Sequence, residues 1–163
     1  MPHLRVFTDG SVDTQLKVGY GAYLVVSDLY TPIDSLKDAV KVKRFEQTSS
    51  TKLELQTLLW SLEEMIALTN GSDDITLTIY TDSQNIIGLP GRRTRLEQSN
   101  YFSGKNRRLS NYELYQKFYR FITRINCEFV KVAGHQASSK KDKIDRLFGL
   151  VDQTSRRALR EDS

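Results

Sequence analysis

The strongest constraint on the fold is a change in hydrophobic spacing about a third of the way along the chain. Three strand-like segments come first, at residues 3–8, 18–27 and 39–47, and short polar links join them. Short links between consecutive strands favour antiparallel pairing. From residue 50 to residue 69, apolar side chains instead recur at helical spacing. The sequence therefore predicts a three-strand antiparallel meander followed by a helix.

Strands and helices alternate in the rest of the chain. The string ITLTIYTD at 75–82 is typical of a fourth strand, and CEFVKVA at 127–133 of a fifth. Three further segments have helical spacing: 83–89, a stretch that begins near Ser110 or Asn111, where either side chain could cap it, and 144–160. Helical crossovers make the strands they join parallel. We predict an α/β fold with a five-stranded mixed sheet, three strands antiparallel and two parallel, flanked by helices.

Length and composition are those of one soluble domain. The 163 residues are 39% hydrophobic and 27% charged, and we treat residues 1–163 as a single domain. No apolar run is long enough to span a membrane, and the N-terminus lacks the basic and then apolar layout of a secretory signal. We therefore expect a cytoplasmic monomer without membrane association, and nothing in the sequence implies a protein partner.

Positive charge is concentrated in one segment of the chain. The formal net charge is +4, and six cations lie between residues 92 and 108: Arg92, Arg93, Arg95, Lys105, Arg107 and Arg108. A basic cluster of this kind is typical of surfaces that bind nucleic acid. We call residues 91–108 the basic segment.

Two aspartates follow two of the predicted strands. Asp9, in FTDGS, comes after the first strand, and Asp82, in IYTDSQ, after the fourth. If these strands are parallel neighbours, both carboxylates lie at the sheet edge where α/β proteins collect their active groups. Two carboxylates at close range repel each other, which favours either a shared proton or a cation between them. A bound metal is the simpler solution.

Two helices offer further acids. Glu54 lies early in the first long helix, at the edge of its apolar stripe. In the last helix, Asp145 and Asp152 are seven residues apart and share one face, so spacing alone does not choose between them. The single Cys127 and the lack of a Cys/His cluster exclude a typical zinc site. Hard oxygen ligands of this kind describe a Mg²⁺ or Mn²⁺ site.

Five motifs, taken together, resemble the pattern of type I ribonuclease H. They are FTDGS, KLELQTLLWSLE, IYTDSQ, VAGHQ and VDQTSRRA, in the order of that family and over nearly the whole chain. The resemblance implies a ribonuclease H-like fold and four metal-binding carboxylates: Asp9, Glu54, Asp82 and Asp152. Asp145 is the alternative to Asp152. His135, in the Gly-His loop, completes the implied catalytic set and would assist proton movement and product departure.

The resemblance also implies the reaction. The family hydrolyses the RNA strand of RNA/DNA hybrids with two divalent ions, Mg²⁺ or alternatively Mn²⁺, and leaves 5′-phosphate and 3′-hydroxyl ends. Gln84 corresponds to a family residue beside the hybrid's minor groove, and the six cations to a hybrid-binding protrusion. Asn111 falls where the family often has an Asn before a helix, and the resemblance makes it another candidate nucleic-acid-binding residue. Gly10 and Ser11 would leave room for the nucleic-acid backbone.

The chain departs from the usual family pattern at three places. VDTQLKVGYG replaces a Gly-rich turn with Asn-Pro after Asp9, Ser50 and Thr51 replace a common Asn pair, and Asn85 replaces a common Tyr. Two other functions are therefore alternatives: a related nuclease for other structured nucleic acids, and a non-catalytic module that binds hybrids. Four acids at one sheet edge favour catalysis, because binding alone has no need of them.

Overall fold

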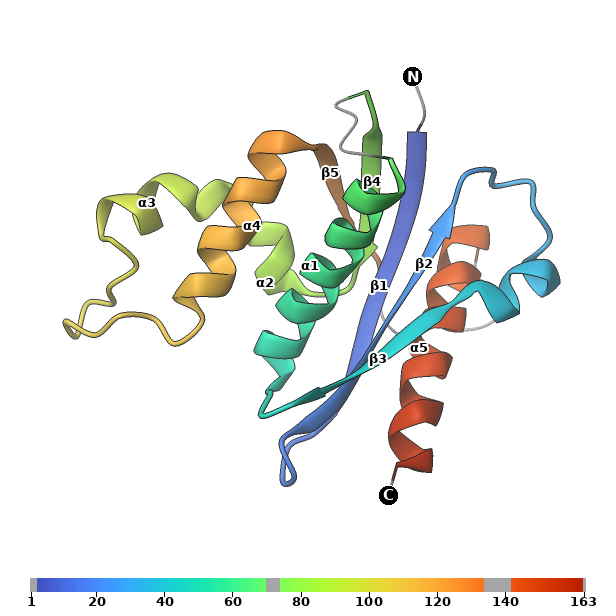
Figure 1. Ribbon diagram of the computed structural model, residues 1–163, viewed down its shortest axis with the longest axis horizontal. Coiled ribbons are helices and arrows are strands. Elements are labelled where there is room, and N and C mark those ends of the chain that lie inside the picture. The colour runs from blue at the N-terminus through green and yellow to red at the C-terminus, as the bar shows by residue number, and fades with distance from the viewer. Residues whose placement is uncertain (1–2, 70–73, 134–141, 163) are drawn as a thin grey trace.

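A five-stranded mixed sheet forms the centre of the computed structural model, which describes residues 3–69, 74–133 and 142–162 (Figure 1). The strands are β1 (His3–Asp13), β2 (Val18–Val26), β3 (Lys41–Glu46), β4 (Thr76–Thr81) and β5 (Asn126–Lys131). Their order is β3-β2-β1-β4-β5. The first three pair antiparallel, β4 is parallel to β1, and β5 is parallel to β4. The predicted sheet is confirmed.

Helices cover both faces of this sheet. They are η1 (Ile33–Ala39), α1 (Ser50–Leu68), α2 (Gln84–Gly88), η2 (Pro90–Arg92), α3 (Arg93–Gln98), α4 (Tyr112–Arg124) and α5 (Lys143–Glu161). Figure 1 shows α1 and α4 on one side of the sheet and α5 on the other. Among the helices of the described ranges, none combines the length and apolarity of a membrane span.

Four local features differ from the sequence prediction. β1 continues to Asp13 because its hairpin pairing with β2 extends that far, so Asp9 lies within a strand and not after it. The link between β2 and β3 contains η1, and the basic segment contains α3. Asn111 is the N-cap residue of α4, but its side chain forms no capping hydrogen bond.

The residues of β1 alternate between two hydrophobic cores. Val6 packs into the core under α1 and α4, and Phe7 into the core under α5. Phe7 stacks on Tyr80 of β4 with ring centroids 4.6 Å apart. Because successive side chains of a strand point to opposite faces, β1 anchors both helical layers at once.

Close packing of α1 on the sheet depends on glycines in β1 and β2. A Cβ atom at Gly21 would lie 2.0 Å from Oγ1 of Thr57, and one at Gly10 would lie 2.8 Å from Cδ2 of Leu53. Ser49 caps the start of α1 by accepting a hydrogen bond from the backbone N–H of Lys52. The cap and the glycines together bring the first two turns of α1 against the sheet.

We predict that Gly21→Ala destabilises the protein by about 1 to 3 kcal/mol, because the added methyl group overpacks the buried contact with Thr57. Urea denaturation would measure the free energy of unfolding. Gly91→Ala is the matched control, since nothing lies within 4 Å of its Cβ position, and its effect should stay within about 0.5 kcal/mol. Equal stability of the two variants would contradict the close approach of α1.

Candidate active site

Four elements bring acidic side chains to one edge of the sheet. Asp9 lies on β1 two residues beyond Phe7, the last residue that pairs with β4. Asp82 follows the end of β4, and Glu54 begins the second turn of α1. These three acids line a small cavity of about 10 Å³, together with Thr8, Thr57, Thr81 and Ile86. The fourth acid, Asp152, reaches this edge from the middle of α5.

Asp9 is the centre of the group. Burial raises the pKa of Asp9 to about 9, helped by a hydrogen bond to the side chain of Asp152 and by the negative charge of Asp82. The backbone N–H of Gly10 acts in the opposite direction but is outweighed. At neutral pH the protonated form of the Asp9 carboxyl is therefore favoured, and in this form it can donate to Asp152. This site disfavours additional negative charge and would favour a cation.

Glu54 is positioned by a serine that sequence reasoning missed. Ser83 Oγ donates a 2.6 Å hydrogen bond to Oε2 of Glu54 and accepts one from the backbone N–H of Ile86, which caps α2. Burial and the charge of Asp82 raise the pKa of Glu54, while the Ser83 hydrogen bond lowers it. The available signal was the serine at the strand-to-helix junction, a typical N-cap.

The two acids of α5 have different surroundings. Asp152 bonds to Asp9 and also accepts a hydrogen bond from Nε of Arg156 at 3.0 Å. Asp145 lies in the first turn of α5, where it forms a capping box with Asp142. Seven residues separate the two acids, about 10 Å along a helix axis. The geometry therefore favours Asp152 as the fourth member of the acidic group.

A pair of serines holds α5 against β1 beside this group. The hydroxyls of Ser11 and Ser155 share a 3.0 Å hydrogen bond, and Ser155 Oγ also donates to the backbone carbonyl of Asp152. Ser155 is fully buried. These bonds hold α5 in the position along β1 that places Asp152 next to Asp9.

The donor set fits a divalent cation by its chemistry. Within the described ranges, no group of three or more His, Cys, Asp or Glu side chains has an arrangement that could hold a metal ion. Asp9 and Asp152 lie within hydrogen-bonding reach of each other, and the charge of Asp152 also raises the pKa of Asp9. Carboxylate oxygens from four elements are nevertheless the ligands that Mg²⁺ prefers, and a divalent charge would replace the shared proton.

The residues predicted to touch nucleic acid lie on several elements of the fold. Gln84 Oε1 accepts a 2.8 Å hydrogen bond from Nζ of Lys131, a residue absent from the sequence prediction. Gly10 packs against Leu53, and Asn111 is the N-cap residue of α4. His135 lies outside the described residues.

Half of the cations in the basic segment have intramolecular partners. Arg92 donates to Oδ1 of Asn85 at 2.6 Å. The guanidinium of Arg108 lies 5.0 Å from the ring centroid of Phe102 and 4.6 Å from that of Tyr112. These contacts stabilise the conformation of the basic segment.

Arg93 is the third partnered cation of the segment. It bonds to Glu97 at 2.6 Å and to Thr123 at 2.8 Å. Arg95, Lys105 and Arg107 are exposed, and their side chains make no such contact with other described residues. Figure 1 shows α3 and the loop that follows it extending away from the sheet.

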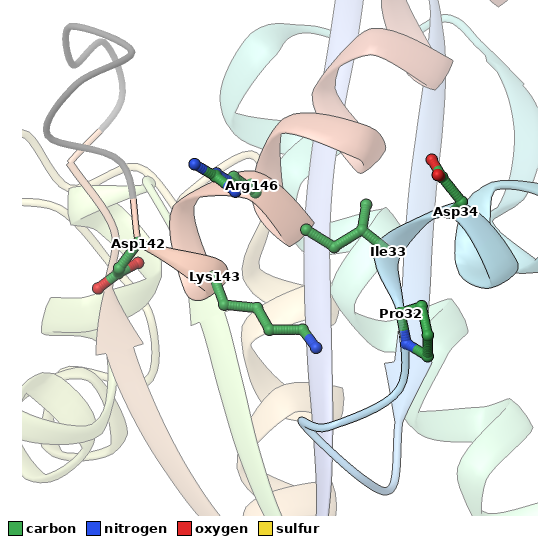
Figure 2. Close-up of a pocket in the computed structure, with 6 residues that line it drawn as sticks. All are labelled: Pro32, Ile33, Asp34, Asp142, Lys143 and Arg146. Carbon is green, nitrogen blue, oxygen red and sulfur yellow. The ribbon is translucent and has the colours of Figure 1, made fainter.

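A second cavity, of about 470 Å³, lies between η1 and the first turn of α5 (Figure 2). Its lining is Pro32, Ile33, Asp34, Asp142, Lys143 and Arg146. Both aspartates of this lining interact with other residues of the protein. Asp34 forms a 3.0 Å ion pair with Lys37, and Asp142 belongs to the capping box of α5. Lys143 donates to the backbone carbonyl of Thr31. This cavity lacks the clustered acids found around Asp9.

We predict that Asp9→Asn stabilises the metal-free protein at neutral pH. Between the ordinary aspartate pKa of 3.8 and the folded value of about 9, the folded state holds a proton that the unfolded state releases. The free energy of unfolding of the wild type therefore falls as pH rises through this window. Urea denaturation in chelator over this range should show a flatter profile for the variant. Parallel profiles would contradict the shifted pKa.

Comparison with known proteins agrees with the motifs and the fold. The RNase H family model matches residues 1–150. A crystal structure of LC11-RNase H1 in complex with RNA/DNA hybrid has a TM-score of 0.60 and 16% identity, covering 96% of this chain and 99% of that one. A second LC11-RNase H1 structure, of the enzyme isolated from compost by a metagenomic approach, has a TM-score of 0.60 and 18% identity, covering 98% and 99%. A comparison with curated proteins gave no match. With the family model covering most of its length, this chain belongs to the ribonuclease H family.

Proposed function

We propose that this protein is a metal-dependent endonuclease that hydrolyses the RNA strand of RNA/DNA hybrids. The observation that carries the proposal is the convergence on Asp9 of acids from α1, α5 and the end of β4. Burying several acids together is unfavourable for folding, so an acidic cluster of this kind is typical of a functional site. The family membership and the hybrid-bound structure of a protein with the same fold support the same substrate.

Asp9, Glu54, Asp82 and Asp152 would hold two Mg²⁺ ions, with Mn²⁺ as the alternative metal. When bound, the ions would activate the attacking water and stabilise the departing 3′ oxygen, giving 5′-phosphate and 3′-hydroxyl ends. Each protein group has its own task in this site. The Ser83 hydroxyl orients Glu54, and the Ser11–Ser155 bond holds Asp152 beside Asp9. His135 is assigned to proton movement and product departure by the family motif alone.

The substrate would lie across the sheet edge and reach the basic segment. Gln84 and Asn111 would contact the minor groove, where RNA displays its 2′-hydroxyl groups. We assign the phosphates of the DNA strand to Arg95, Lys105 and Arg107, whose side chains have no partner among the described residues. The partnered ones, Arg92, Arg93 and Arg108, instead maintain the shape of the segment.

We predict that the purified protein cleaves the RNA strand of a labelled RNA/DNA hybrid in Mg²⁺ or Mn²⁺ and that chelator stops the reaction. Asp9→Asn should lower kcat/KM by about 100-fold or more, because it removes charge stabilisation of the transition state. Asp34→Asn, an exposed aspartate of η1 paired with Lys37, is the matched control and should keep full activity.

The same assay with double-stranded RNA and DNA separates the alternatives. Preferred cleavage of another duplex would assign the protein to the wider group of structured-nucleic-acid nucleases. Hybrid binding without cleavage in either metal would identify a binding module and overturn the proposal.

We predict that Asp152→Asn reduces kcat/KM by about 100-fold or more, while Asp145→Asn reduces it by less than about threefold. The reason is that Asp152 bonds to Asp9, whereas Asp145 caps α5. Loss of that cap should instead lower the free energy of unfolding by about 1 kcal/mol. Steady-state kinetics and urea denaturation of both variants measure the two effects. The reverse order of activities would make Asp145 the fourth ligand.

A further inference from the structure

Asp82 lines two hollows at the active edge of the sheet. One is the small cavity that it shares with Asp9 and Glu54. The other is larger, about 570 Å³, and is lined by Asp82, Lys131, Val132 and Ala133 at the end of β5. A ligand that contacts Asp82 therefore has room to continue beyond the carboxylates, along the end of the neighbouring strand.

The backbone places Lys131 beside Asp82. Lys131 is the last residue of β5 and pairs in register with Thr81, the residue before Asp82. The backbone N–H of Val132 also donates a 2.9 Å hydrogen bond to the carbonyl of Thr81. Adjacent strands lie about 4.8 Å apart, so the stem of Lys131 starts one strand away from the acidic group.

The ammonium group of Lys131 is held by a neutral partner. Its Nζ donates to Oε1 of Gln84 at 2.8 Å. An ammonium has three N–H donors, so this bond uses one and does not neutralise the charge. It also fixes the amide of Gln84, because an ammonium accepts no hydrogen bond and Gln84 must turn its oxygen toward Lys131. The NH₂ group of Gln84 then faces away from Lys131.

Among the described residues that line the two hollows, Lys131 is the one cation. Such a charge on an exposed side chain, beside a small apolar surface at Ala133, suits a phosphate and its sugar. In an extended nucleic-acid strand, a phosphate held at the carboxylates is followed by another along the backbone. The large hollow continues from Asp82 along the end of β5, so a strand that contacts Asp82 and continues in that direction would bring its next phosphate to Lys131.

We infer that Lys131 binds the phosphate adjacent to the one that is cleaved, on the same strand, and holds Gln84 with its NH₂ group toward the substrate. The inference rests on the proposed function, because it requires a nucleic-acid strand at Asp82. Lys131 is a positioning residue and does not touch the reacting atoms. It therefore acts on substrate binding and leaves the chemical step nearly unchanged.

The test compares Lys131→Gln and Lys131→Arg with Lys37→Gln, which removes one exposed lysine of η1 and so matches the change in net charge. Binding of labelled hybrid is measured in chelator between about 50 and 200 mM KCl. Lys131→Gln should weaken binding about 3- to 10-fold and reduce the slope of log K against log salt by about one. Lys131→Arg and Lys37→Gln should stay within about twofold of the wild type.

Steady-state kinetics gives an independent readout. For Lys131→Gln, KM should rise by the same factor as the dissociation constant, while kcat changes by less than about threefold. An unchanged salt slope would overturn the inference. A decrease confined to kcat would overturn it too, because it would mean that Lys131 acts on the chemical step through the acidic side chains. Lys131→Met, which keeps the apolar stem, provides a second neutral variant if Lys131→Gln unfolds.

The two proposals fail separately. If the wild type binds or cleaves another duplex in preference to the hybrid, the hybrid proposal fails, and the same salt series on that duplex decides the role of Lys131. If the wild type binds neither hybrid, double-stranded RNA nor DNA, both proposals are overturned.

Discussion

Backbone pairing along β1 sets the geometry on which the site depends. β1 pairs with β2 as far as Asp13, but it pairs with β4 only as far as Phe7. Beyond Phe7, β1 no longer pairs with β4, and Asp9 lies two residues past this point. Asp82 follows the end of β4 at the same edge. An acid from each strand therefore borders one gap, which helices on both faces can reach.

Small residues let the helices reach that gap. Because Gly21 has no side chain, Thr57 can pack directly on β2, where a Cβ atom would clash with it. α1 therefore lies close to the sheet and brings Glu54 with it. On the other face, the bond between Ser11 and Ser155 holds α5 near β1. Larger residues at these positions would push the helices outward, and the acids would separate even if every secondary-structure element survived.

The acids that meet there carry an energetic cost. Burial raises the pKa of Asp9 to about 9 and also raises that of Glu54, so burying these two side chains in their charged forms is unfavourable. A shared proton between Asp9 and Asp152 is one way to reduce this cost, and a divalent cation is another. The cations near the site also differ in their contacts. Arg92 of the basic segment donates a hydrogen bond to Asn85, and this contact holds the segment in shape. Lys131 instead donates to the neutral amide of Gln84, which leaves its positive charge uncompensated.

The sequence by itself determined the strands, most of the helices and the motif acids, because hydrophobic spacing and turn residues are local properties of the chain. It could not show that β1 extends past Asp9, since that extension is produced by pairing with β2. The roles of Ser83 and Lys131 likewise depend on partners 29 and 47 positions away in the chain. Asp145 and Asp152 lie on one helix face and look equivalent to any periodic pattern. Only the packing of α5 on β1 distinguishes them, because it sets which turn of the helix stands beside Asp9.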